Sequence, residues 1–310
     1  MTPEESEQIA VAGAAFFQNM SFMIFQTGLC GTYMLAFIIS MLIILQRENN
    51  GWAHKALIAL LLAGFTMTVL YTCADIAGFL LQVKLGLVVL LPGGLMAQAM
   101  AANMKTAVME ILEEWSGSFI ILIADMAIVW RAWALWSENR LIKWTLLMIL
   151  LTDIGINIAD AIVDTKTYLK SNANNTVALD WVSTVLNLTV NIVATLLIAH
   201  RAWTHHQITH AVLHNKKTQV EAIPLLMVES GAIFGVVQLS IIILEALDIQ
   251  AAESSPLGNA NFFFVALYIY TSALNPVALV ILIQTGNTYE QSFHLEDVPS
   301  LEINSLPNDN

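Results

Sequence analysis

The stretch ILIADMAIVWRAWALWSENR, residues 121–140, decides the fold class of this chain. It is an apolar run, interrupted by Asp125, that ends among three Trp and two Arg residues. The ending Arg-Ala-Trp of residues 131–133 returns at residues 201–203, within LIAHRAWTHH. Arg side chains reach lipid headgroups from the end of a membrane helix, and Trp side chains prefer the same interface. The repeated ending therefore indicates two helices that cross a membrane in the same direction.

The composition of the whole chain agrees with a membrane setting. Of its 310 residues, 57% are hydrophobic and 12% are charged, and the mean hydropathy is +0.69. Soluble domains carry about 25% charged residues, so this chain cannot cover itself with a polar surface and needs lipid as its solvent. The formal net charge is −12 and there is no basic patch, which argues against nucleic acid as a partner.

Seven apolar runs are long enough to span a bilayer, whose hydrocarbon core needs about 20 helical residues. No strand-like alternation suggests a barrel, so we predict an all-α membrane protein, a seven-transmembrane-helix bundle over residues 22–284. Residues 1–21 are then an extracellular or luminal segment, and residues 285–310 are an acidic, disordered cytosolic tail. The predicted spans are 22–45, 56–81, 112–136, 142–163, 179–200, 223–246 and 261–284.

An eighth span is the main alternative, because LGLVVLLPGGLMAQAMAANM, residues 85–104, is apolar and long enough. Pro92, Gly93 and Gly94 in its middle predict a turn between two short apolar pieces. Charge also favours seven spans with the N-terminus outside and the C-terminus in the cytosol, since more basic residues then lie on the inner side. The inner loops would hold eight, Arg47, Lys55, Arg131, Arg140, Lys143, Arg201, Lys216 and Lys217, and the outer loops four, Lys84, Lys105, Lys166 and Lys170.

Asparagine sequons follow the same topology. Asn174 lies in the outer loop after the fourth span, and Asn19 lies in the outer N-terminal segment. Both are therefore predicted glycosylation sites of a secretory-pathway glycoprotein. The expected location is the plasma membrane or an endomembrane, with the lipid bilayer as a constant partner.

Polar side chains inside the spans are the candidates for a functional site, because ionisable groups in hydrocarbon are costly. Asp153, Asn157 and Asp160 are spaced i, i+4 and i+7 and share one helix face, as do two Asn residues of the next span. We predict that such residues line a polar interior that opens outward between spans two to five. The ligand-binding candidates are Asp75, Asp125, Asp153, Asn157, Asp160, Asn187 and Asn191.

No Lys, Arg or His lies deep within a predicted span, so these carboxylates have no internal basic partner. A carboxylate in that setting takes up a proton or binds a cation or amine. The structural alternative is a set of hydrogen bonds among Asp and Asn that only holds the helices together. Glu110, Glu113 and Glu114, at the outer mouth of the third span, are either a solvated helix end or an attractive entrance for cations.

Five residues are candidates for hinge or coupling roles: Arg131, Arg201, Glu229, Asn275 and Pro276. The simplest interpretation of the two Arg residues is an anchor at the lipid interface. Glu229 lies in MVESGAIFG, whose small residues allow close helix approach, and Pro276 permits a kink. His206, His210 and His214 share a helix face, but a solvated amphipathic extension explains them, so we predict no metal and no cofactor.

Three segments resemble those of the orphan seven-helix membrane proteins of mushroom-forming fungi. They are DMAIVWRAWALW at the end of the third span, ATLLIAHRAW in the fifth and ESGAIFGVVQL in the sixth. The resemblance covers all seven spans and implies a receptor-like architecture, with no defined ligand or reaction. Rhodopsin-like receptors match less well: LNPVALVIL partly resembles their Asn-Pro motif, but their acidic-Arg-aromatic triplet is absent because Trp130 precedes Arg131.

The sequence thus favours a receptor-like protein that senses a small or lipophilic ligand and signals to a cytosolic partner. Two alternatives stay open at this point. The chain could be an integral-membrane enzyme, such as a terpene cyclase with Asp125 or Glu229 as general acid. It could also be a proton- or cation-coupled carrier, since unpaired intramembrane carboxylates suit proton relay.

Overall fold

The computed structural model is an all-α bundle across the residues that it describes, which are 3–46, 51–89, 94–136, 138–170, 177–212, 219–248 and 256–296. Within these residues, seven helices are long and apolar enough to cross a membrane. The predicted fold class is therefore confirmed, and the chain is a multi-pass membrane protein. The helices are α1 (Pro3–Leu45), α2 (Trp52–Val83) with a π-helical extension η1 (Lys84–Val88), α3 (Gly94–Leu135), α4 (Arg140–Lys170), α5 (Val177–Val212), α6 (Gln219–Asp248) and α7 (Pro256–Glu296).

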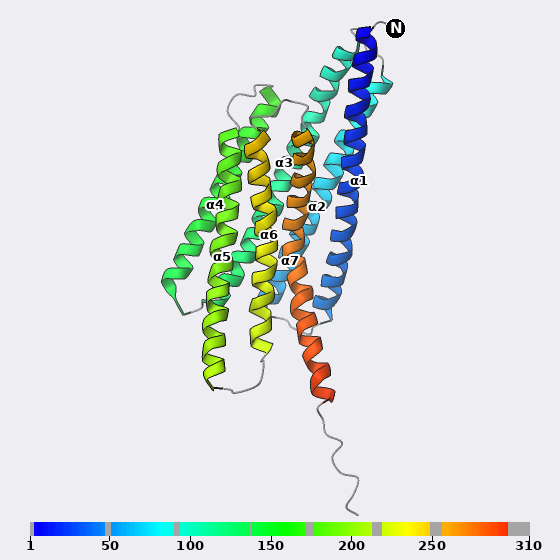
Figure 1. Cartoon of the computed structure of the whole chain (residues 1–310). Coiled ribbons are helices and arrows are strands. Elements are labelled where there is room, and N and C mark those ends of the chain that lie inside the picture. Colours follow the sequence, from blue (N-terminus) through cyan, green and yellow to red (C-terminus); the bar gives the residue numbers. More distant parts are fainter. Residues whose placement is uncertain are drawn as a thin grey trace, which may run out of the picture.

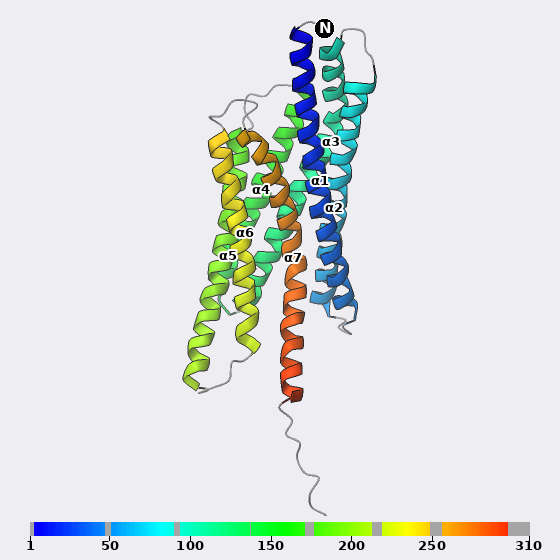
Figure 2. The same cartoon turned by 45° about the vertical axis from the view of Figure 1, so that its right-hand side comes forward.

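Helix α3 crosses the bundle obliquely (Figure 1 and Figure 2): it begins beside α1 and α2 and ends near α4 and α5. It packs against α2, α4, α5 and α7, while α6 packs between α5 and α7. Mid-span apolar side chains on the outside stay uncovered, such as Leu196 at 63% exposed and Val236 at 64%. A helix that is apolar on every face is explained by lipid around the bundle.

The chain begins at one end of the bundle and α7 leaves at the other, as an odd number of crossings requires (Figure 1). We refer to these as the N-terminal end and the C-terminal end. Helix α1 already begins at Pro3, within the segment expected to precede the first span. Helix α7 continues to Glu296, so the segment from residue 285 that was expected to be disordered starts as helix.

The segment 85–104 does not form an eighth span. Its first residues extend α2 through η1 to Val88, and its second half is the start of α3 from Gly94. The predicted turn residues Pro92 and Gly93 lie outside the described residues. The first piece thus lengthens α2 in π-helical form as far as Val88, and the second lengthens α3 at its start, both beyond the predicted spans.

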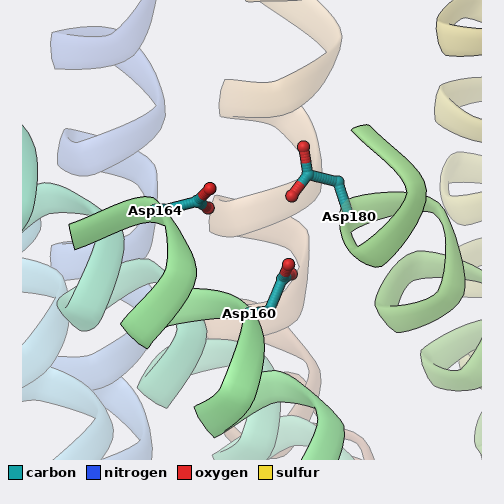
Figure 3. A group of neighbouring side chains, drawn as sticks. All are labelled: Asp160, Asp164 and Asp180. Atoms are coloured by element: carbon teal, nitrogen blue, oxygen red, sulfur yellow. The ribbon is translucent and has the colours of Figure 1, made fainter. Parts of the chain in front are cut away.

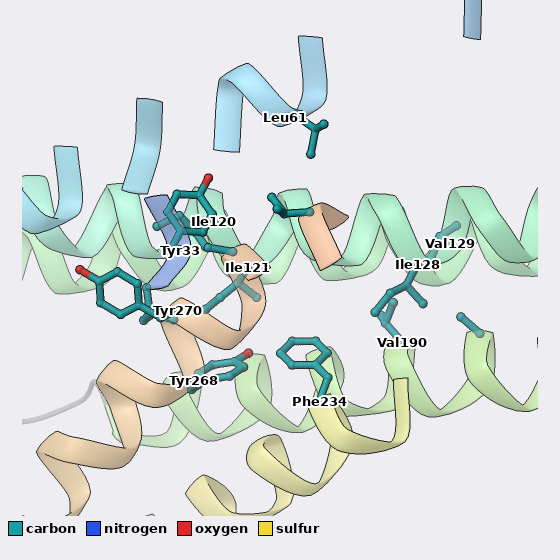
Figure 4. Close-up of a cluster of buried hydrophobic side chains, with 14 of the residues drawn as sticks. Tyr33, Leu61, Ile120, Ile121, Ile128, Val129, Val190, Phe234, Tyr268 and Tyr270 are labelled. Carbon is teal, nitrogen blue, oxygen red and sulfur yellow. The ribbon is translucent and has the colours of Figure 1, made fainter. Parts of the chain in front are cut away.

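A buried apolar cluster joins the other six helices, α1, α2 and α4 to α7, to α3, and Figure 4 shows part of it. Helix α6 approaches α5 closely at Gly231, where a Cβ atom would collide with the side chain of Thr195. The close approach predicted for the MVESGAIFG segment is therefore present. The labelled members of the cluster are Ile120, Ile121, Ile128 and Val129 of α3, Tyr33 of α1, Leu61 of α2, Val190 of α5, Phe234 of α6, and Tyr268 and Tyr270 of α7.

Candidate functional site

A cavity of about 460 Å³, which we term the acidic chamber, lies in the N-terminal half of the bundle. Among the described residues that line it, none is Lys, Arg or His. A cavity of this composition attracts positive charge. Seven carboxylate side chains from four helices line it: Glu110, Glu113 and Glu114 of α3, Asp160 and Asp164 of α4, Asp180 of α5 and Glu245 of α6.

Helical spacing explains how these acids come together. The three Glu residues of α3 lie three and four positions apart, and Asp160 and Asp164 of α4 lie four apart, so each group shares one helix face. Asp180 is in the first turn of α5, and Glu245 is close to the end of α6. Because α3 and α5 begin at the N-terminal end while α4 and α6 finish there, all four acidic faces meet in the same half of the bundle (Figure 1).

A network of side-chain hydrogen bonds connects α4, α5 and α7 along the chamber wall. Ser183 donates to Asp160 Oδ2 at 2.7 Å, and Asn157 donates to Asn187 Oδ1 at 2.9 Å. Asn187 in turn donates to the hydroxyl oxygen of Tyr268 at 3.2 Å. The three candidates Asn157, Asp160 and Asn187 thus line the chamber and also join the helices, so the ligand-site and packing interpretations apply to the same residues.

The deeper candidates Asp125, Asp153 and Asn191 are 0%, 0% and 1% exposed and are not among the residues that line the chamber. Asp153 Oδ1 accepts a hydrogen bond from Asn157 at 3.1 Å. Asp125 interacts electrostatically with Asp153, but neither of its carboxylate oxygens has a hydrogen-bond partner. The prediction placed these residues in the open interior. The structure instead buries them away from the chamber, where α3 packs against its neighbouring helices.

Asn191 has a packing role between α5 and α6. Its amide donates to Gln238 Oε1 at 3.0 Å and to the backbone carbonyl of Gly231 at 3.1 Å. The close approach at Gly231 brings that carbonyl within reach. This residue therefore fits the helix-packing alternative rather than the ligand-site interpretation.

Asp75 lies in a second cavity of about 450 Å³, which we term the side chamber, lined by α1, α2, α3 and α7. The side chamber shares Tyr71, Glu110 and Glu113 with the acidic chamber. The single interior predicted between spans two and five is thus divided into two cavities. Helices α6 and α7, which the prediction left out, contribute Glu245 and Tyr268 to the acidic chamber.

The two Arg-Ala-Trp copies have different environments. Arg131 donates to the side-chain oxygen of Asn275 at 3.5 Å and to its backbone carbonyl at 3.3 Å, so it contacts α7 next to Pro276. Arg131 therefore contacts α7 in addition to any role at the lipid interface, because α7 comes within reach of its guanidinium. Arg201 is exposed and its guanidinium lies 5.6 Å from the ring centroid of Trp136, as expected for an interface residue.

Glu229 is exposed and lines a third cavity, of about 470 Å³, between α6 and α7. Most of its neighbours there are apolar, including Ile233, Phe234 and Leu274, and Asn275 also reaches this cavity. We refer to this cavity as the groove between α6 and α7. It shares no lining residue with the acidic chamber.

Some of the residues singled out in the sequence lie partly or wholly outside the part of the chain that the structure describes. Asn174 and His214 lie outside the described residues, and the side chains of His206 and His210 are likewise not described. Asn19 is exposed within α1, close to the start of the candidate span Phe16–Leu45, and it lines the side chamber. Glycosylation at Asn19 and Asn174 stays a prediction.

Several chamber residues were missed from the sequence, among them Asp164, Asp180, Glu245 and Tyr268. The spacing of Asp164 from Asp160 and of Asp180 from Asn187 was the available signal, since i+4 and i+7 positions share a face. Comparison of the chain with models of known protein families gives no match, and a search of curated proteins gives none either. The proposals below therefore depend on the geometry of the site.

Proposed function

We propose that the chain is a receptor-like membrane protein whose acidic chamber binds a small positively charged molecule, such as an organic amine, from the outer side of the membrane. The observation that carries this proposal is the convergence of seven carboxylates on a cavity whose described lining has no basic side chain. The volume of about 460 Å³ suits a small molecule, since ligand sites range over about 300–1,000 Å³. The topology with the N-terminus outside is part of the proposal, because it makes the chamber accessible from the exterior.

A receptor must also connect its ligand to the opposite side of the membrane, and α7 offers that connection. Tyr268 lines the chamber and receives a hydrogen bond from Asn187. Two turns further along α7, Asn275 accepts hydrogen bonds from Arg131 and precedes Pro276. A ligand that displaces Tyr268 would shift α7 at its proline and change the Arg131 contact. The basic residues at the C-terminal end would present this change to a cytosolic partner.

Binding of amines to the purified protein in zwitterionic nanodiscs tests the proposal. Spermidine, tryptamine and choline serve as probes, and tryptophol, which replaces the amine of tryptamine by a hydroxyl group, is the matched neutral compound. We expect saturable binding of at least one amine and none of tryptophol. Glu113→Gln combined with Asp160→Asn should weaken that binding at least about tenfold, because about 1.4 kcal/mol of charge-assisted contact is lost.

Glu229→Gln is the control, since Glu229 lines the separate groove between α6 and α7 and should leave amine affinity unchanged. Equal binding of tryptamine and tryptophol, or unchanged affinity in the double variant, would contradict the proposal.

A proton- or cation-coupled carrier is the second candidate, and Asp125 favours it, because both of its buried carboxylate oxygens lack a hydrogen-bond partner. The apolar side chains of Ile128, Ile198 and Val277 fill the core beyond it, which favours a receptor over a continuous path. Proteoliposomes with an internal pH-sensitive dye distinguish the two. A proton flux that Asp125→Asn abolishes would favour the carrier and count against the receptor.

The enzyme alternative has weaker support. Asp125 lines none of the three cavities described above, and Glu229, the other proposed general acid, is exposed in the groove between α6 and α7. A general acid must reach its substrate directly. Incubation of membranes with prenyl diphosphates, followed by a search for a cyclised product, would decide this alternative.

A further inference from the structure

Within the acidic chamber, three Asp side chains from two helices converge on one point. Asp160 and Asp164 come from α4, and Asp180 comes from the first turn of α5. One carboxylate oxygen from each lies within 4.8 Å of the other two. Figure 3 shows the three side chains pointing toward a common space between the two helices. We infer that this space binds a Ca²⁺ ion that ties the N-terminal end of α5 to α4.

The surroundings of Asp160 give an independent reason to expect a ligand. This side chain is only 9% exposed, and Ser183 donates a hydrogen bond to its Oδ2 atom. Its Oδ1 atom is buried and accepts no hydrogen bond from a neighbouring donor, and the same holds for Oδ1 of Asp180; the two carboxyl groups themselves lie within hydrogen-bonding reach of each other. Buried acceptors without a donor are rare in folded proteins, because each loses its hydration without compensation. A cation in the shared space would restore that compensation to both oxygens.

The protein itself offers no positive charge at this point. None of the described residues that line the chamber is basic, and two further acids, Glu114 and Glu245, interact electrostatically with the triad. Three carboxylates this close repel one another in a partly buried cavity. A proton shared between Asp160 and Asp180 would relieve part of this repulsion, whereas a cation held by all three carboxylates would relieve all of it.

The donor set and its spacing favour Ca²⁺ among the biological cations. All three side chains are carboxylates, which suit hard cations, whereas Zn²⁺ sites are built from His and Cys. Ca²⁺ lies about 2.3–2.6 Å from its ligand oxygens, so two oxygens on one ion are at most about 4.6–5.2 Å apart. The observed limit of 4.8 Å agrees with this range. Ca²⁺ takes 6–8 oxygen ligands, and water in the chamber would fill the remaining positions.

This inference goes beyond the proposed function, because the site would hold Ca²⁺ whether or not the chamber takes an organic amine. It also predicts a regulatory relationship. Ca²⁺ and an amine would compete for the same negative charge. Millimolar Ca²⁺ outside the cell would therefore raise the concentration of amine needed to occupy the chamber. Extracellular Ca²⁺ modules bind with dissociation constants of about 10⁻⁴–10⁻³ M, which fits a site of three carboxylates completed by water.

Terbium luminescence on the purified full-length protein in zwitterionic nanodiscs tests the site after removal of metals with EDTA. Tb³⁺ stands in for Ca²⁺, and two indoles are suitably placed to sensitise it. Trp115 donates to Thr165, the neighbour of Asp164, at 2.9 Å, and Trp181 follows Asp180 in the chain. We expect saturable emission that Ca²⁺ displaces and an increase of the unfolding temperature with Ca²⁺ but not with K⁺ at equal ionic strength.

Asp164→Asn and Asp180→Asn, made separately, should each raise the half-saturating Ca²⁺ concentration at least about tenfold. Asp75→Asn is the matched control, because Asp75 lies in the side chamber and is outside the triad. In EDTA, the Asp164 and Asp180 variants should unfold at the same temperature as the wild type or higher, since each loses one repelling charge. That measurement separates loss of the site from loss of the fold.

Absence of saturable Tb³⁺ emission in the wild type, or an equal loss in Asp75→Asn, would overturn the inference. An intact Ca²⁺ response without any amine binding would instead overturn the proposed function and leave the cation site in place.

Discussion

The guanidinium of Arg131 in α3 donates a hydrogen bond to the backbone carbonyl of Asn275 in α7, with 3.3 Å between Nη2 and the oxygen. The next residue is Pro276, the one proline inside α7. A proline has no N–H group, so the backbone carbonyl of Ser272, four residues earlier, loses its helical donor. The Ser272 hydroxyl also donates to the carbonyl of Tyr268 at 2.8 Å, which weakens the same turn. Arg131 therefore contacts α7 at the turn where Pro276 interrupts the backbone hydrogen bonding.

Arg131→Gln should lower the free energy of unfolding by about 1–3 kcal/mol, because the neutral, shorter side chain loses the charged hydrogen bonds to α7. SDS titration of the purified protein, followed by tryptophan fluorescence, measures the change. Arg201→Gln is the control from the second Arg-Ala-Trp copy, since Arg201 is exposed and contacts only the face of Trp136 among the contacts described. Equal destabilisation by the two substitutions would mean that both arginines act only as interface residues.

The Asn187 amide links α4 and α7 by accepting from Asn157 and donating to Tyr268. Asn187→Ala and Tyr268→Phe should therefore show a coupling energy in a double-mutant cycle. Hydrogen bonds between membrane helices contribute about 0.6 kcal/mol on average and about 1.7 kcal/mol at most, so we expect a value in this range. Unfolding of the two single variants and the double variant provides the number.

The comparison pair for that cycle is Thr189→Ala with Tyr268→Phe. Thr189 is exposed in α5 and its hydroxyl donates only to its own helix, to the carbonyl of Val185. Its effect should add to that of Tyr268→Phe without coupling. A coupling energy near zero for Asn187 as well would show that the hydrogen bond to Tyr268 adds no stability.

The number of spans could be predicted from the sequence because length and hydropathy report directly on a bilayer crossing. The rotation of each helix about its own axis, which decides the face that is buried, could not be predicted. In lipid, apolar side chains such as Leu196 and Val236 face outward, so hydrophobic periodicity no longer marks the buried face. Polar spacing indicated the inward face of α4 through Asp153, Asn157 and Asp160, but Glu245 is a lone acid near the end of α6 without such a pattern. Its place in the chamber follows only from how α6 packs.

The same reasoning explains the outcome for Asp125. A single acid in an apolar run predicts an inward-facing residue, and that prediction is correct, since Asp125 is 0% exposed. Whether it meets a cavity or a packed core depends on the side chains of neighbouring helices. Here Ile128 and Val129 of its own helix belong to the packed core, whereas Ile121, one turn earlier, also lines the chamber, so the chamber ends just before Asp125.

Gly231 of α6 lies close to Thr195 of α5, and this predicts a sharp steric effect. A Cβ atom at this position would collide with the Thr195 hydroxyl and lie 3.2 Å from its methyl carbon. Gly231→Ala should therefore lower the free energy of unfolding by about 1–3 kcal/mol through overpacking. Gly155→Ala, where no atom lies within 4 Å of the added Cβ, should be neutral or stabilising.

A second substitution identifies the cause. Thr195→Ala removes the hydroxyl and the methyl group but keeps a Cβ atom at 3.4 Å, an ordinary contact distance. Combined with Gly231→Ala, it should recover most of the lost stability. Failure of this rescue would show that the cost comes from the hydrogen bond between Asn191 and the Gly231 carbonyl rather than from the collision.

Asp125 has two buried carboxylate oxygens without a hydrogen-bond partner, which lowers the stability of the fold. A residue with such a cost is expected where it serves a function. Threonine has nearly the same volume, and its hydroxyl can donate to the backbone carbonyl four residues earlier, as Thr68 and Thr72 do in α2. Asp125→Thr should therefore raise the free energy of unfolding by about 1–3 kcal/mol. If Asp125 takes part in ligand response or proton transfer, the same variant should lose that activity while it gains stability.

Asp153→Thr is the matched control, because Asp153 is equally buried but accepts a hydrogen bond from Asn157 at 3.1 Å. Its substitution leaves the Asn157 amide with one fewer acceptor and should give no gain, or a loss of about 0.5–1.5 kcal/mol. Opposite signs for the two substitutions, measured by the same SDS titration, would establish that Asp125 is kept at the expense of stability. A destabilised Asp125→Thr variant would mean that its carboxyl group contributes to packing, and the case for a carrier that depends on it would lose its basis.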